Sequence, residues 1–154
     1  MAKVLTILLL LLYSEMGRNF WRTSNYTAAK RYLQMSLDMY GRLYGDNCDQ
    51  ADIADALDIL SCCFSDMGDH REAIINHTLS LEMDKRIHGE DSEHPDIAAV
   101  LYNIGNNYCN MKEYTKAEEY YRQSLNMYKR IHGEESDHTD IAMVLWGSVI
   151  FTLT

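Results

Sequence analysis

Apolar residues recur along most of the chain at the spacing of an amphipathic helix. The clearest stretch is residues 97–111, where the apolar positions lie three or four residues apart and therefore form one stripe. A second stripe of the same kind follows the polar break at Lys112 and Glu113. The pattern predicts helices at about 3–22, 26–44, 51–67, 70–87, 95–111, 114–131 and 139–153, and no strand.

The predicted helices belong to a sequence repeat with a period of 44 residues. Residues 83–98 and 127–142 are identical at twelve of sixteen positions, and a weaker copy lies 44 residues before the first of them. A fixed period of this size is typical of stacked helix pairs. We therefore predict an all-α, right-handed solenoid in one domain, 1–154, with units at about 3–45, 51–89 and 95–133 and a half unit at 139–154.

Residues that end and begin helices recur with the same period. A glycine follows the second helix of each unit (Gly45, Gly89, Gly133), where a left-handed C-cap would favour glycine. Pro95 opens the next helix with a backbone φ that suits a first turn. Each unit is therefore expected to be two helices joined by a tight turn, with a longer polar connector between units.

Two further positions carry a family resemblance. Each unit has a small residue in its first helix, namely Gly17, Ser61 and Gly105, and an alanine in its second, namely Ala29, Ala73 and Ala117. On these residues nearly the whole chain resembles the tetratricopeptide repeat family, in which the small residues let the paired helices pack closely. The long repeat and its His-Pro-Asp-Ile-Ala connector resemble the kinesin-light-chain and nephrocystin-type subgroup.

The resemblance implies a peptide-binding site. Ligands of this family bind a concave groove lined by the first helices, which here carry Arg18, Asp58, Tyr102, Asn103, Asn106 and Asn110. The three asparagines follow i, i+3, i+7, so their amides share one helix face and could pair with an extended peptide backbone. We expect a non-enzymatic scaffold that binds a protein or peptide partner without a cofactor. The alternative is an exposed helix face whose polar residues are merely solvated.

Charge and motifs exclude several functional classes. The formal net charge is −9, and clustered Lys and Arg are absent, so no nucleic-acid partner is expected. The chain has no G-x-S-x-G sequence and no phosphate-binding glycine loop, so we expect no catalytic residues. Asp58 and its acidic neighbours would also repel acidic ligands, which argues against the cargo of kinesin light chains.

The histidines raise the question of a metal site. His88 and His132 are repeat equivalents, as are His94 and His138, and we interpret them as solvated connector residues. His77 falls on an apolar stripe and is interpreted as a core histidine without a Cys or His partner at ligand spacing. The four cysteines have no zinc-like spacing and are expected to be reduced thiols. No metal site is predicted.

Both ends of the chain are apolar. Lys3 and the run Val4–Leu12 resemble a secretory signal, but the run is too short for a membrane span. The residues that follow it, Tyr13, Met16, Gly17 and Phe20, also keep the register of the repeat. A cytoplasmic protein is expected; the alternative is a secreted one, if residues 1–14 act as a signal peptide. The run Trp146–Leu153 lies on an unpaired helix. This pattern favours a fragment of a longer array, or end-to-end self-association through Leu8–Leu12 and Trp146–Phe151.

Overall fold

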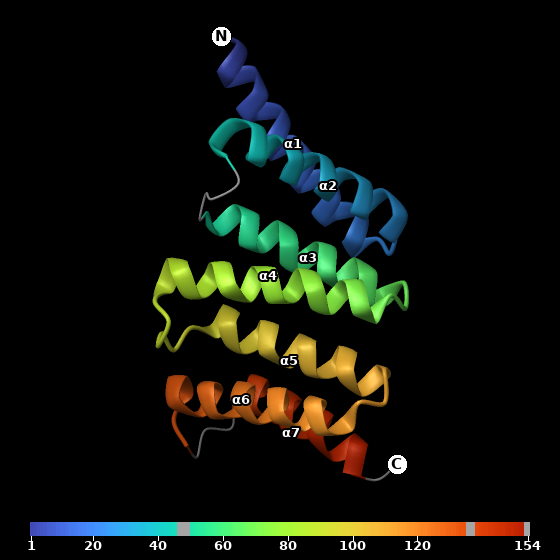
Figure 1. Cartoon of the computed structure of the whole chain (residues 1–154), viewed down its shortest axis with the longest axis vertical. Helices are drawn as coiled ribbons and strands as arrows, with labels where there is room; N and C mark the ends of the chain where they lie inside the picture. Colours follow the sequence, from blue (N-terminus) through green and yellow to red (C-terminus); the bar gives the residue numbers. More distant parts are fainter. Residues whose placement is uncertain (46–49, 135–137, 153–154) are drawn as a thin grey trace. The chain divides into compact units, whose positions relative to one another are not determined.

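The chain forms helices joined by short connectors (Figure 1). The structure, a computed structural model, describes residues 1–45, 50–134 and 138–152, with side chains described as far as residue 149. No strand occurs in those ranges, so the predicted all-α class is confirmed, and each helix boundary lies within one residue of its predicted position. The seven helices found there are α1 (Ala2–Arg22), α2 (Tyr26–Tyr44), α3 (Ala51–Asp66), α4 (His70–His88), α5 (Pro95–Asn110), α6 (Tyr114–His132) and α7 (Thr139–Thr152).

The helices group into two compact units, Met1–Met83 and Asp84–Thr154. The boundary falls inside α4, so most of α4 belongs to the first unit and its last turn to the second. Each unit has its own buried apolar cluster, and each is described by itself below. The expectation of one domain spanning 1–154 stays a prediction.

In the first unit, a glycine brings α1 and α2 into contact. A Cβ added to Gly17 would lie 2.6 Å from Cγ of Leu33, so no larger residue fits without a shift. The hydroxyl of Ser80 on α4 donates to the carbonyl of Ala54 on α3 at 3.0 Å, which satisfies a buried polar group. The core around these contacts contains Ala29, Leu33, Ala56, Leu60, Cys63, Phe64 and Ala73.

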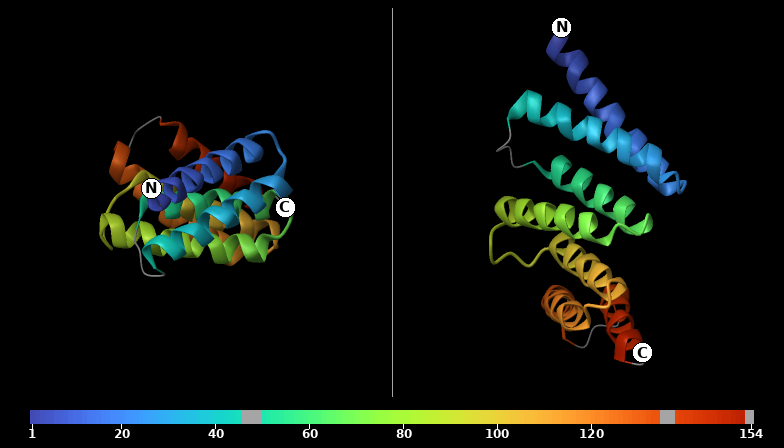
Figure 2. Two further views of the ribbon diagram at one scale, coloured as in Figure 1. Left: turned by 90° about the horizontal axis from the view of Figure 1, so that it is seen from above. Right: turned by 45° about the vertical axis from the view of Figure 1, so that its right-hand side comes forward.

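The second compact unit repeats this construction, 88 residues later for the glycine contact and 44 residues later for the serine hydrogen bond. A Cβ on Gly105 would lie 2.8 Å from two ring carbons of Tyr121, so α5 and α6 also meet at a glycine. The hydroxyl of Ser124 donates to the carbonyl of Ala98 at 2.7 Å, in the positions equivalent to Ser80 and Ala54. The buried cluster consists of Ala98, Ala117, Tyr121, Tyr128, Ile141 and Val144. Figure 2 gives two further views of these helices.

The tight turn within each unit requires a positive φ. Gly68 supplies it in the middle one of the three sequence repeats with φ of 83°, whereas Ser24 and Lys112 adopt φ of 59° and 62° in the first and third repeats. The C-caps also have positive φ, but they are not left-handed helical: Gly45 has ψ of 169° and Gly133 has ψ of 148°. The prediction of left-handed C-caps is therefore wrong for these two glycines. They adopt an extended backbone region with positive φ that is essentially restricted to glycine, because a Cβ would clash there.

Replacing Lys112 by glycine is expected to stabilise the protein. Lys112 is exposed and has φ of 62°, a conformation that strains a residue with a Cβ. After allowance for the greater freedom of an unfolded glycine, the gain is about 0.5–1 kcal/mol. Urea denaturation measures it. A matched Glu118→Gly change, on the exposed face inside α6, should instead cost about 0.5–1 kcal/mol, and a loss of stability in Lys112→Gly would contradict the strain.

The N-terminal turns of α1 are poorly covered. They extend past the end of α2 in Figure 1 and in the right-hand view of Figure 2, and Leu5, Leu8 and Leu12 are each at least half exposed. Large apolar residues are also exposed on α7, where Trp146 is 71% accessible. Within the described residues, no helix combines the length and the apolarity needed to cross a lipid bilayer.

Candidate functional site

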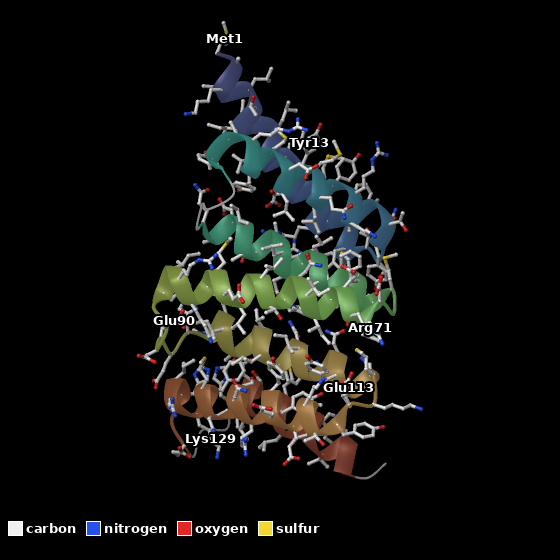
Figure 3. The ribbon with its side chains drawn as sticks, in the orientation of Figure 1. Met1, Tyr13, Arg71, Glu90, Glu113 and Lys129 are labelled. Atoms are coloured by element: carbon white, nitrogen blue, oxygen red, sulfur yellow. The ribbon has the colours of Figure 1, made fainter. Side chains whose placement is uncertain are left out.

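The predicted asparagine ladder lies on α5, in the second unit. Asn103 and Asn106 are half-buried and Asn110 is exposed, while the intervening Asn107 is buried. The Asn107 amide donates to the carbonyl of Asn103 at 2.9 Å, which fixes it within the helix. α5 therefore buries one asparagine and leaves three with solvent-accessible surface. Figure 3 shows the side chains of this unit, with Glu113 labelled at the turn that follows α5.

Asn106 is the most constrained member of the ladder. Its Oδ1 accepts a hydrogen bond of 2.6 Å from the hydroxyl of Tyr121 on α6. Burial, followed by the neighbouring Cys109, raises the pKa of Tyr121 well above its usual value, so this hydroxyl stays a donor. Asn106 can therefore offer a ligand its NH2 group more readily than its carbonyl oxygen.

Tyr102 lies between the ladder and α7. Its ring centroid lies 5.7 Å from that of Tyr121, and a Cβ on Gly147 would lie 3.2 Å from its Cε2. The absence of a side chain at Gly147 thus lets α7 approach the tyrosine closely. Trp146, the next residue along α7, is largely exposed. Tyr102 and Trp146 are the aromatic residues that the second unit offers beside the asparagines.

The predicted groove residues of the first compact unit, Arg18 and Asp58, each contact other polar side chains. Arg18 on α1 lies 3.7 Å from the carboxylates of Glu15 and Asp55. It also lines a pocket of about 80 Å³ with Ser14 and Leu33. These contacts neutralise part of the arginine's charge and reduce its availability to an acidic ligand.

Asp58 takes part in a cluster that the sequence analysis missed. Its Oδ1 lies 2.9 Å from Nδ1 of His77, whose side chain is 1% exposed. One ligand atom each from Asp58, Cys62 and His77 lies within 4.8 Å of the others. The interpretation of His77 as lacking a cysteine partner is therefore wrong, because the turn between α3 and α4 brings Cys62 next to it.

The thiol in this cluster is not an activated nucleophile. Burial is the main cause that raises the pKa of Cys62 far above its usual value, and the carboxylates of Asp58 and Asp66 raise it further. Cysteine nucleophiles depend instead on a lowered pKa. The arrangement of Cys62, His77 and Asp58 therefore does not favour cysteine catalysis.

The connector histidines form stacked pairs. The rings of His88 and His94 are 3.7 Å apart, and those of His132 and His138 repeat this distance. Nδ1 of His94 also accepts from the backbone N–H of Asp96 at 3.3 Å, so His94 is the N-cap of α5. These histidines fix the connector to the next helix, in addition to being partly solvated.

Comparisons with solved structures support the fold. BtubC (BKLC) from P. vanneervenii superposes with a TM-score of 0.84 at 18% identity over 96% of this chain, which spans 57% of the length of that protein. The TPR domain of Arabidopsis FLU superposes with a TM-score of 0.70 at 20% identity, over 81% of this chain and 98% of that domain. Among curated proteins, no sequence matches this one. The predicted tetratricopeptide solenoid class is thus confirmed.

The sequence itself carries the family signature. The profile of the tetratricopeptide repeat matches residues 8–92 and 96–149, which is most of the chain. The matched residues include Gly17 and Gly105, at which the paired helices meet, and Ala29 and Ala117 of the second helices. Since both the sequence profile and the helix packing agree, this chain belongs to the tetratricopeptide repeat family.

Proposed function

We propose that this protein is a non-enzymatic scaffold that holds an extended segment of a partner protein against α5. Tetratricopeptide repeats are protein–protein interaction scaffolds, and the proposal adds where and how this one binds. The binding surface consists of Tyr102, Asn103, Asn106 and Asn110. The observation that carries the proposal is the row of three accessible asparagine side chains on one face of a helix.

The chemistry of the surface favours a peptide backbone over a particular side chain. A carboxamide can donate and accept, so Asn103 and Asn110 can each pair with a backbone amide of an extended ligand. Asn106, with its oxygen held by Tyr121, would donate to a ligand carbonyl. Tyr102 and Trp146 add apolar contact. With a net charge of −9 on the chain, basic or neutral segments are favoured by long-range attraction.

Selection from a display library of random peptides tests this proposal without knowledge of the natural partner. The untagged chain is immobilised, and the enriched peptides are titrated by calorimetry. Enriched peptides that compete for one site, with affinity retained at moderate salt, support binding through amide hydrogen bonds. Failure to enrich any peptide, or binding that salt abolishes, would contradict the proposed mechanism.

A second candidate function is self-assembly, favoured by the exposed leucines of α1. Leu8 and Leu12 are 58% and 51% exposed, and a contact between copies would bury them. Sedimentation velocity over a concentration series separates this candidate from the first. Assembly predicts a sedimentation coefficient that grows with concentration and returns to the monomer value in Leu8→Glu/Leu12→Glu. A constant monomer value in the unmodified chain would eliminate it.

A further inference from the structure

The cluster of Asp58, Cys62 and His77 occupies a place that recurs in every unit. Positions 44 residues later are Tyr102, Asn106 and Tyr121, and positions 44 residues earlier are Ser14, Arg18 and Leu33. In the second compact unit, the Tyr121 hydroxyl donates to Asn106 and the two tyrosine rings pack together. In the first repeat, one small pocket is lined by Ser14, Arg18 and Leu33, among other residues. The three positions therefore converge in all three repeats, and each repeat fills them with different chemistry.

The middle repeat fills this place with groups whose polar atoms are not satisfied. His77 is fully buried, and neither of its ring nitrogens has a hydrogen-bond partner of acceptable geometry among the described residues. Oδ1 of Asp58 is buried and unsatisfied in the same way, although it lies 2.9 Å from the ring. At the position of His77, the equivalent residues Leu33 and Tyr121 leave no such deficit, because one is apolar and the other is hydrogen-bonded. Nε of Arg18 in the first repeat is also buried without a hydrogen-bond partner in the described part of the chain, but it belongs to a cation and cannot bind a metal. Unsatisfied buried polar groups are costly unless a ligand or ion completes them.

We infer that Asp58, Cys62 and His77 bind a transition-metal ion, with Zn²⁺ the best match. A thiolate, an imidazole nitrogen and a carboxylate oxygen are the three ligand types that zinc takes in proteins. Asp58 and Cys62 are four residues apart on α3, so they project from one helix face, and His77 approaches from α4. Their ligand atoms lie within 4.8 Å of one another, so the folded chain already brings the three groups together around one place.

The ligand count and exposure define the kind of site. Three protein ligands leave one position of a tetrahedral zinc ion for water or for a donor from a partner. Asp58 and Cys62 are only partly buried, which gives the ion a path from solvent, whereas His77 lies on the inner side. The metal would join α3 to α4 within the first compact unit. It would therefore act chiefly as a structural link between the two helices of one repeat.

Cobalt titration of the untagged full chain tests the site directly, because Co²⁺ substitutes for Zn²⁺ and reports its ligands. We expect one equivalent of Co²⁺ to produce a sulfur-to-cobalt charge-transfer band in the near ultraviolet, together with intense visible bands of a tetrahedral site. Zn²⁺ should then displace the cobalt. Addition of Zn²⁺ at about a hundred times its Kd should raise Tm by roughly 5–10 °C.

Matched variants locate the ligands. Cys62→Ser should remove the charge-transfer band, whereas Cys109→Ser should leave it unchanged. The double variant Cys62→Asn/His77→Tyr copies the pair found at Asn106 and Tyr121, so it should fold, as measured by circular dichroism, yet show neither the band nor the rise in Tm.

The connector histidines provide the remaining control. His94→Ala/His138→Ala removes one ring from each stacked pair, so it should not change the charge-transfer band. Absence of the band in the unmodified chain would overturn the inference and leave His77 and Asp58 as a polar contact between α3 and α4. A band that persists in Cys62→Ser would likewise overturn it. None of these outcomes depends on peptide binding at α5.

Discussion

Gly105→Leu is expected to lower Tm by roughly 6–12 °C, corresponding to a loss of about 3 kcal/mol. A Cβ at this position would lie 2.8 Å from Cδ1 and Cε1 of Tyr121 and 3.4 Å from the carbonyl oxygen of Ala117. The tyrosine ring cannot move aside cheaply, because its hydroxyl donates to Asn106 and its ring packs in a tilted arrangement against that of Tyr102. The better helix propensity of leucine offsets only about 0.8 kcal/mol of this loss in stability.

Thermal unfolding followed by circular dichroism measures this effect. Ala142→Leu is the matched control, since it introduces the same side chain at an exposed position of α7 in the same compact unit. We expect its Tm to stay within about 2 °C of the unmodified chain, as is usual for surface substitutions. A Tm for Gly105→Leu equal to that of the control would show that α5 and α6 are not held together at the glycine.

Asn103→Ala/Asn110→Ala is expected to weaken peptide binding about 10- to 100-fold. Each change removes one carboxamide, and a net hydrogen bond contributes about 0.5–1.5 kcal/mol. These two asparagines are preferred to Asn106 because removing Asn106 would also leave the Tyr121 hydroxyl without its acceptor. A loss of binding in the double variant therefore reports on the ligand contact and not on the packing of α6.

Titration of a selected peptide against each variant measures the change in Kd. Glu118→Ala/Arg122→Ala is the control, with both changes at exposed positions of α6. It should retain the affinity within about twofold, apart from any long-range charge effect. Equal affinities for the unmodified chain and the asparagine variant would show that α5 is not the binding surface, whatever the control showed.

The helices could be predicted from the sequence because their signals are local and repeated. Apolar spacing and a glycine after each second helix recur with the 44-residue period, and Pro95 marks the start of α5, so most boundaries were constrained more than once. The backbone conformation of the C-caps could not be predicted as well. A glycine tolerates both the left-handed region and the extended region with positive φ, and the direction of the following connector decides between them.

The contacts of the site were less predictable than the residues that form it. The spacing of Asn103, Asn106 and Asn110 predicts a shared helix face. It does not reveal that the Tyr121 hydroxyl donates a hydrogen bond to Oδ1 of Asn106. Nor does spacing within one helix reveal Cys62 beside His77, since the two lie fifteen residues apart on different helices. Alignment of the three repeats was the available signal, because it places His77 at the position of Leu33 and Tyr121.

The measurement that tests the central claim most directly is an NMR titration of the isotopically labelled chain with a selected peptide. Side-chain amide resonances of asparagine are resolved from the backbone and report hydrogen bonding at the groups in question. Binding against α5 predicts the largest shifts at the side chains of Asn103, Asn106 and Asn110 and at the indole of Trp146. Shifts concentrated on the outer residues of α6, or on the leucines of α1, with the α5 asparagines unchanged, would contradict it.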